Sequence, residues 1–233
     1  MINRNIKFIW NEREVSILLP KNYFSAPNQR FPAVITQDGD YLFKRYRVTQ
    51  PDVIFIGLSP LDRDTEYTPW DAETDVGNYT GKADAYLQML TQDFIPFLIE
   101  SYRIDENDIG ISGGSFGALV SLYALLNYGD YFKRYILLSP SLWYPDFLDH
   151  IKHSPDILDE KHIFWYVGGA EALGRTNIMG TMVPNNKKAV SLINEKLSHP
   201  ESQLIFMTND DGLHRHRFFI RHFIQAAAVY YGK

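Results

Sequence analysis

The chain has 233 residues, of which 45% are hydrophobic, and a formal net charge of −5. This mild acidity, without any cluster of Lys and Arg, argues against nucleic acid as the ligand, because phosphate neutralisation requires grouped basic side chains. The absence of cysteine excludes disulfides, thiolate metal sites and cysteine nucleophiles.

The amino-terminal residues MINRNIKFIW lack the apolar stretch of a signal peptide, and no run approaches the roughly 18 apolar residues of a membrane-spanning helix. We therefore expect a cytoplasmic protein without a membrane partner. The length favours one domain over residues 1–233. A homodimer is compatible with such a chain, although the sequence does not fix the oligomeric state.

The first part of the chain predicts an antiparallel start followed by buried strands. Ile6–Trp10 and Val15–Pro20 are short strands joined by a polar turn, which indicates a hairpin. Phe31–Gln37 is a third strand, and the continuous apolar run Val53–Leu58 is typical of a strand that is covered on both faces. The loop Ser59–Gly81 has the length of a functional or disordered loop.

The second part alternates helices with strands. Apolar residues recur every three to four positions over Lys82–Tyr102, which predicts an amphipathic helix that Pro96 kinks or restarts. Later elements are expected in this order: helix Ala118–Tyr128, strand Tyr135–Leu138, strand His162–Val167, helix Asn186–Leu197, strand Gln203–Met207 and helix Arg217–Tyr231. This order predicts an α/β fold with a mostly parallel central sheet and helices on both faces. Ligands of such sheets bind beyond the carboxyl ends of the strands.

Ser115 is the centre of a G-x-S-x-G pattern, Gly113-Gly114-Ser115-Phe116-Gly117, between an apolar run and a predicted helix. Small neighbours permit a sharp strand-to-helix turn that exposes the serine hydroxyl. The alternative is a glycine-rich turn whose serine caps the helix. We interpret Ser115 as a candidate nucleophile, with the backbone N–H of Phe116 as a donor to the developing oxyanion.

A serine nucleophile needs a base, and a third group usually orients that base. His214 follows the last predicted strand and is the candidate base, with His216 as its competitor. Glu171 follows the strand before it and is the candidate orienting carboxylate. Asp210 and Asp211 are the alternatives, although Asp beside Gly is also typical of plain turns.

Loops after other strands supply the remaining candidates. The backbone N–H of Asp40, which follows the turn Asp38-Gly39, is a candidate second oxyanion donor; the alternative is a plain turn. The segment Gly174–Pro184 is either a lid or an ordinary surface loop. The side chains expected to contact substrate are Arg63, Tyr67 and Trp143, with packing or solvation as their alternative.

Taken together, these motifs resemble the Putative esterase family of α/β hydrolases, which includes esterase D and the trilactone-siderophore esterases. The most specific match is Ser139-Pro140-Ser141-Leu142-Trp143. The others are Asp38-Gly39, the loop Arg63-Asp64-Thr65-Glu66-Tyr67-Thr68-Pro69, Phe94-Ile95-Pro96-Phe97, the G-x-S-x-G turn and the Gly-x-His at Gly212 to His214. The resemblance covers about Ile6 to Tyr231. Two places depart from the family pattern: Ala118 replaces a glycine, and Arg215-His216-Arg217 precede the aromatic residues.

The resemblance implies an α/β-hydrolase fold with Ser115 as nucleophile, His214 as base, and Asp40 and Phe116 as oxyanion donors. It further implies hydrolysis of a small or medium carboxylic ester through an acyl-serine, with no cofactor or metal and with the small-molecule ester as the partner. A trilactone siderophore as the specific substrate, acyl transfer on the same machinery and, last, a non-catalytic binding module are the alternatives.

Overall fold

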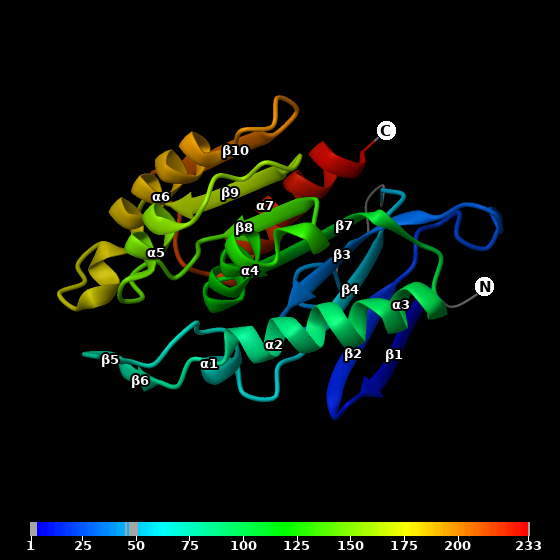
Figure 1. The fold of residues 1–233 in the computed structure, drawn as a ribbon, viewed down its shortest axis with the longest axis horizontal. Coiled ribbons are helices and arrows are strands. Elements are labelled where there is room, and N and C mark those ends of the chain that lie inside the picture. Colours follow the sequence, from blue (N-terminus) through cyan, green and yellow to red (C-terminus); the bar gives the residue numbers. More distant parts are fainter. Residues whose placement is uncertain (1–3, 45, 47–50, 233) are drawn as a thin grey trace.

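A mixed eight-stranded sheet forms the centre of the computed structural model, which describes residues 4–44, 46 and 51–232 (Figure 1). The strand order is β1-β2-β4-β3-β7-β8-β9-β10. These strands are β1 (Asn5–Trp10), β2 (Arg13–Leu18), β3 (Phe31–Gln37), β4 (Ile54–Leu58), β7 (Ile104–Gly114), β8 (Arg134–Leu138), β9 (His162–Gly168) and β10 (Gln203–Asn209). The pairs β1–β2 and β2–β4 are antiparallel and the other pairs are parallel. The predicted parallel sheet with an antiparallel amino-terminal hairpin is confirmed.

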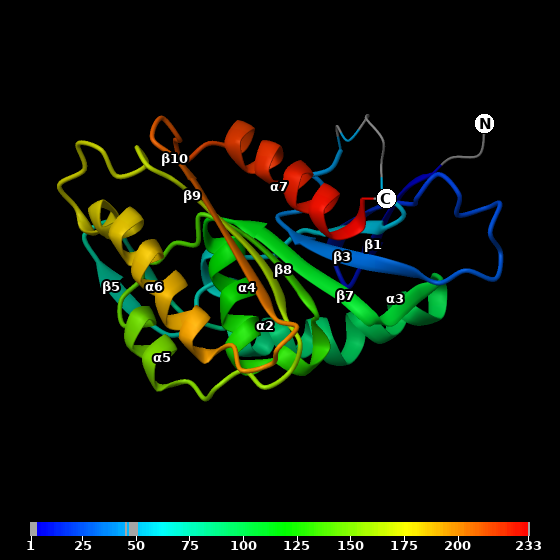
Figure 2. The same cartoon turned by 90° about the horizontal axis from the view of Figure 1, so that it is seen from above.

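Helices cover both faces of the sheet, as Figure 2 shows. On one face lies α7 (His216–Tyr231), whose Phe219 and Phe223 pack with Phe55 of β4 and Phe164 of β9 in a buried apolar cluster. The other face carries α2 (Ala83–Met89), α3 (Ile95–Ser101), α4 (Phe116–Asn127), α5 (Phe147–His153) and α6 (Met182–Lys196). Because the central strands are buried from both sides, their sequences are continuous apolar runs and do not alternate.

The predicted helix Lys82–Tyr102 is continuous in direction but changes its winding. A π-helical turn, η1 (Leu90–Phe94), separates α2 from α3. Pro96 lies in the first turn of α3, directly after this π-helical turn, so the winding changes where its missing amide hydrogen interrupts the helical hydrogen bonds. The α-helical winding therefore restarts next to Pro96, as the sequence predicts.

The loop Ser59–Gly81 contains regular structure that the sequence did not reveal. Its elements are α1 (Arg63–Glu66), β5 (Ala72–Thr74) and β6 (Gly77–Tyr79), the last two forming an antiparallel hairpin. Side-chain hydrogen bonds stabilise these short elements. The Asp62 carboxylate caps the amino terminus of α1, and the Thr74 hydroxyl bonds the carbonyl and the amide of Gly77 across the hairpin turn. Arg13 of β2 anchors α1 through a bidentate ion pair with Glu66 at 2.7 and 2.8 Å.

The segment Gly174–Pro184 also includes regular structure. A 3₁₀ turn, η3 (Ile178–Thr181), leads directly into α6, which begins four residues before the predicted Asn186. The amide of Ile178 donates to the carboxylate of Asp75 in the β5–β6 hairpin at 3.2 Å. That this segment moves as a lid stays a prediction.

No helix within residues 4–44, 46 and 51–232 combines the length and the apolar character needed to cross a bilayer.

His222 of α7 stacks on Tyr166 of β9 with 3.7 Å between ring centroids. Burial lowers the pKa of His222, and the charge of Arg221 lowers this pKa further. Below about pH 6.5 the unfolded chain therefore binds more protons at this histidine than the folded chain. We expect the free energy of unfolding to fall as the pH drops through this region.

Thermal unfolding at about pH 7.5 and about pH 5.5 measures this dependence, and His222→Phe keeps the stacked ring while removing its titration. The variant should lose less stability on acidification than the wild type, by at most about 1.4 kcal/mol per pH unit. Part of the dependence should remain, because burial also lowers the pKa of His150. Equal losses in both proteins would contradict the prediction.

Candidate active site

Ser115 lies at the sharp turn between β7 and α4, where its φ of +60° falls in the left-handed region that non-glycine residues rarely adopt. A methyl group on Gly113 would lie 2.3 Å from the carbonyl carbon of Gly117, so glycine is required at this close approach. Phe116 is the first residue of α4, so its N–H has no intrahelical partner. The G-x-S-x-G motif therefore forms a strand-to-helix turn with a free amide beside the serine.

Left-handed residues follow three neighbouring strands at this edge of the sheet. Asp38 follows β3, Ser115 follows β7 and Ser139 follows β8, with φ values of +61°, +60° and +52°. Each such residue costs on the order of 1–3 kcal/mol, and strain of this kind gathers at functional sites. The carboxyl ends of β3, β7 and β8 are therefore the candidate active site.

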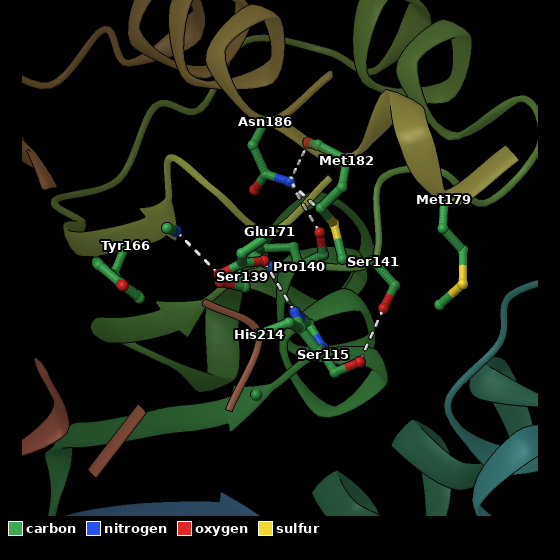
Figure 3. A network of polar contacts seen from close by, with 12 residues as sticks. Ser115, Ser139, Pro140, Ser141, Tyr166, Glu171, Met179, Met182, Asn186 and His214 are labelled. Carbon is green, nitrogen blue, oxygen red and sulfur yellow. Dashed lines mark hydrogen bonds and ion pairs between the residues drawn. The ribbon is translucent and has the colours of Figure 1, made fainter. Parts of the chain in front are cut away.

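His214 and Glu171 form a hydrogen-bonded pair beside Ser115. Nδ1 of His214 lies 2.8 Å from Oε2 of Glu171, whose side chain is only 1% exposed. In Figure 3 the imidazole of His214 lies between Glu171 and Ser115. A carboxylate partner places the proton on Nδ1, which leaves Nε2 as an acceptor for a serine proton. The competitor His216 packs against Tyr41, with 4.9 Å between ring centroids.

Backbone contacts bring the acid and the base together from loops that follow different strands. The amide of Gly169 donates to the carbonyl of Asn209 (2.8 Å), and the amide of Ala170 donates to the carbonyl of Gly212 (3.0 Å). The loop after β9, with Glu171, is thereby joined to the loop after β10, with His214. The alternative carboxylates, Asp210 and Asp211, are exposed to solvent.

The sequence assigned no chemical role to two buried serines at the candidate site, although both belong to the match Ser139-Pro140-Ser141-Leu142-Trp143. Oγ of Ser141 lies 3.1 Å from Oγ of Ser115, and Oγ of Ser139 donates to Oε1 of Glu171 at 2.5 Å. Both belong to the Ser-Pro-Ser turn directly after β8, next to the strand that ends at the nucleophile turn (Figure 3). That match and the position directly after β8 were the two signals in the sequence that pointed to this turn.

A cavity of about 480 Å³ opens beside Ser115. Its lining residues are Asp38, Tyr41, Arg63, Gly114, Ser115, His214, His216 and Phe219. Arg63 makes a bidentate ion pair with Asp38 at 2.7 and 3.0 Å, and it also donates to the carbonyl of Gly114 at 3.3 Å. Burial raises the pKa of the Tyr41 hydroxyl, which therefore stays neutral in the cavity wall.

The residues predicted to contact substrate divide between the cavity wall and the interior. Arg63 lines the cavity, whereas Tyr67 and Trp143 are not among the lining residues that the structure describes. Tyr67 is fully buried, and its hydroxyl accepts a hydrogen bond from the amide of Asp38 (3.1 Å). Trp143 is 4% exposed and packs on Phe116. Both aromatic rings therefore pack inside the protein, Tyr67 against the turn at Asp38 and Trp143 against Phe116.

The turn that carries the candidate second oxyanion donor is fixed by its neighbours. Gly39 has a φ of +74°, and its carbonyl accepts a hydrogen bond from the hydroxyl of Thr36 at 2.7 Å. The carboxylate of Asp40, which follows, pairs with Lys7 at 3.0 Å. The role of the Asp40 amide as a donor stays a prediction.

Gly212 holds the His214 loop close to β9, and a side chain would force the loop away. A methyl group on Gly212 would lie 2.6 Å from Cα of Gly168 and 2.6 Å from the Tyr166 hydroxyl. We expect Gly212→Ala to lower kcat/KM about 100-fold, because a displacement of about 1 Å in a reacting group has that effect. Steady-state hydrolysis of an aryl ester measures the loss.

Gly129→Ala is the matched control, because its methyl group would meet only ordinary contacts at 3.7 Å, far from the candidate site. Activity of Gly212→Ala within threefold of this control would contradict the prediction.

No group of three or more His, Asp or Glu side chains that could hold a metal ion occurs in the part of the chain that the structure describes.

The chain is similar to known proteins over nearly its whole length. Residues 7–229 match the family model described as Putative esterase. Uncharacterized protein YbbA of Bacillus subtilis (strain 168) is 30% identical over 235 residues, which cover 95% of this chain and 93% of that protein. An IroE-like serine hydrolase from Shewanella oneidensis has a TM-score of 0.80 at 20% identity, covering 94% of this chain and 75% of that one. Siderophore hydrolase EstB from Aspergillus nidulans has a TM-score of 0.74 at 16% identity, covering 98% and 95%.

Proposed function

Because the chain belongs to the Putative esterase family, we propose that it is a serine carboxylic-ester hydrolase that acts through an acyl-serine intermediate on a small or medium ester. One observation carries the proposal: Ser115 on its strained turn lines the same cavity as His214, which is hydrogen-bonded to the buried Glu171. A nucleophile, a base and a group that orients the base are the components that this chemistry needs.

In the first half of the reaction, Oγ of Ser115 attacks the ester carbonyl carbon and gives its proton to Nε2 of His214. The amides of Phe116 and Asp40 would donate to the oxyanion that forms. The imidazolium then protonates the leaving alkoxide, the carbon–oxygen bond breaks, and the acyl group stays on Ser115. Glu171 holds the imidazole in the required tautomer and stabilises its charged form.

In the second half, His214 takes a proton from water, and the resulting hydroxide attacks the acyl-serine. Collapse of this second tetrahedral intermediate releases the carboxylic acid and returns the proton to Ser115. The Ser115 hydroxyl contacts Ser141 in this structure. We expect its bond to Nε2 of His214 to form when substrate binds, because the catalytic hydrogen bonds of free enzymes are often loose.

The residues that line the cavity favour a substrate ester that carries an aromatic or hydroxylated group. Tyr41 and Phe219 offer aromatic walls, and the guanidinium of Arg63 adds polar donors. Because one structure of the same fold is a siderophore hydrolase, trilactone siderophores belong in the substrate panel.

A fluorophosphonate probe followed by peptide mass mapping tests the proposal. We expect one adduct, on Ser115, and hydrolysis of a short-chain aryl ester that the probe abolishes. Acetyl, longer acyl, feruloyl and trilactone esters then define the preferred substrate, and added alcohol separates hydrolysis from acyl transfer. A folded protein that neither labels at Ser115 nor hydrolyses any of these esters would overturn the proposal.

A further inference from the structure

Ser139 occupies a backbone conformation that glycine would adopt more easily. Its φ is +52°, and it is fully buried directly after β8. A left-handed non-glycine residue costs on the order of 1–3 kcal/mol, which glycine would not incur. The chain therefore retains a strained position where the side chain has a specific contact.

That contact is with the carboxylate of Glu171. Oε1 accepts hydrogen bonds from the Ser139 hydroxyl at 2.5 Å and from the Gly168 amide at 2.9 Å, while Oε2 faces Nδ1 of His214 (Figure 3). Rotation of the carboxylate would break both bonds at Oε1. The two donors thus fix the plane of the carboxylate and direct its other oxygen at the imidazole.

The turn that carries Ser139 has its own anchors. The side-chain amide of Asn186 donates to the carbonyl of Pro140 at 2.9 Å, and Asn186 in turn accepts a bond from the Trp165 indole at 2.8 Å. The backbone amide of Ser139 donates to the carbonyl of Tyr166 at 2.7 Å. Because these contacts fix the path of the chain, the Ser139 hydroxyl is not needed to hold the turn.

We propose that Ser139 is a positioning residue for the hydrolysis: its hydroxyl fixes the rotation of the Glu171 carboxylate, and through it the tautomer and direction of His214. This inference rests on the proposed function of Ser115, His214 and Glu171. Ser139 itself is not among the described residues that line the cavity, so it acts through Glu171 and not on the substrate.

A double-mutant cycle between Ser139 and Glu171 tests the proposal in the full-length protein. Ser139→Ala should lower kcat about 10- to 100-fold with KM within about twofold, because the base loses its alignment and binding does not. In a Glu171→Ala background the same substitution should cost less than about threefold, since no carboxylate remains to be held. Ser121→Ala, which removes a buried serine hydroxyl bonded to the Gly117 carbonyl, is the matched control and should stay within about threefold of wild type.

Ser139→Gly separates positioning from stability. Glycine accepts a φ of +52° without strain, so this variant should fold at least as well as Ser139→Ala and still lose the same kcat. Proton NMR adds a direct readout: the bond to Glu171 should deshield the Nδ1 proton of wild-type His214, and this signal should shift or broaden in both variants.

Two results would overturn the proposal while leaving the proposed roles of Ser115, His214 and Glu171 intact. One is an equal effect of Ser139→Ala with and without Glu171; the other is wild-type kcat in Ser139→Gly. Full activity of Glu171→Ala alone would instead show that Glu171 does not orient His214. The proposal for Ser139 would then fail together with the proposed role of Glu171. Failure of the proposed function as a whole has another signature, namely full activity after Ser115→Ala.

Discussion

Ser115→Ala is expected to lower kcat/KM for a short-chain aryl ester by at least about 10⁴-fold in a protein that remains folded. Under the proposed mechanism the variant cannot form the acyl-serine, and only the proposed amide donors and the surface of the cavity remain to assist direct attack by water. The thermal midpoint should not fall, because the substitution removes one partly exposed hydroxyl at a strained backbone position. Initial rates and a thermal melt measure both quantities.

Ser191→Ala on the exposed side of α6 is the matched control for loss of a serine hydroxyl. Its turnover should equal that of the wild type. If Ser115→Ala instead retains more than about a tenth of wild-type activity, the nucleophile lies elsewhere and the mechanism fails.

Glu171→Gln is expected to lower kcat about 10³- to 10⁴-fold with the geometry preserved, because the new amide selects the wrong tautomer of His214. The two donors at Oε1, the Ser139 hydroxyl and the Gly168 amide, require the glutamine oxygen on their side. The amide NH₂ then faces Nδ1 of His214 and donates to it. The imidazole proton moves to Nε2, which can no longer accept from Ser115.

Asp210→Asn and Asp211→Asn separate this interpretation from the alternatives that the sequence left open. Both carboxylates are exposed, and that of Asp211 accepts a hydrogen bond from Asn209 at 2.6 Å. We expect each variant within about threefold of wild-type kcat. A loss at either aspartate comparable to that of Glu171→Gln would assign the orienting role to this loop.

The position of the candidate site could be read from the sequence because its residues follow predicted strands. Glu171 after β9 and His214 after β10 lie beyond the carboxyl ends of parallel strands, so they must approach Ser115 at one edge of the sheet. Apolar runs identified those strands, and the glycines around Ser115 identified the turn.

Features built from individual side-chain contacts could not be read in this way. The Asp62 cap of α1 and the Thr74 closure of the hairpin are single polar residues in a stretch that lacks periodicity. Tyr67 and Trp143 follow predicted strands in loops, which suggested substrate contact, but their rings are buried. The match Ser139-Pro140-Ser141-Leu142-Trp143 pointed to the turn, but only the folded arrangement shows that the Ser139 hydroxyl bonds Glu171.

The hairpin of β5 and β6 borders the candidate site without contributing a reacting group. Tyr79 at its end packs on Phe116, next to the nucleophile, and Asp75 at its tip reaches the amide of Ile178. Exchange of the hairpin tip alone, residues 74–77, leaves Tyr67 and the Tyr79–Phe116 contact in place. For a protein engineer, this makes the hairpin tip the place to begin loop exchange beside the candidate site.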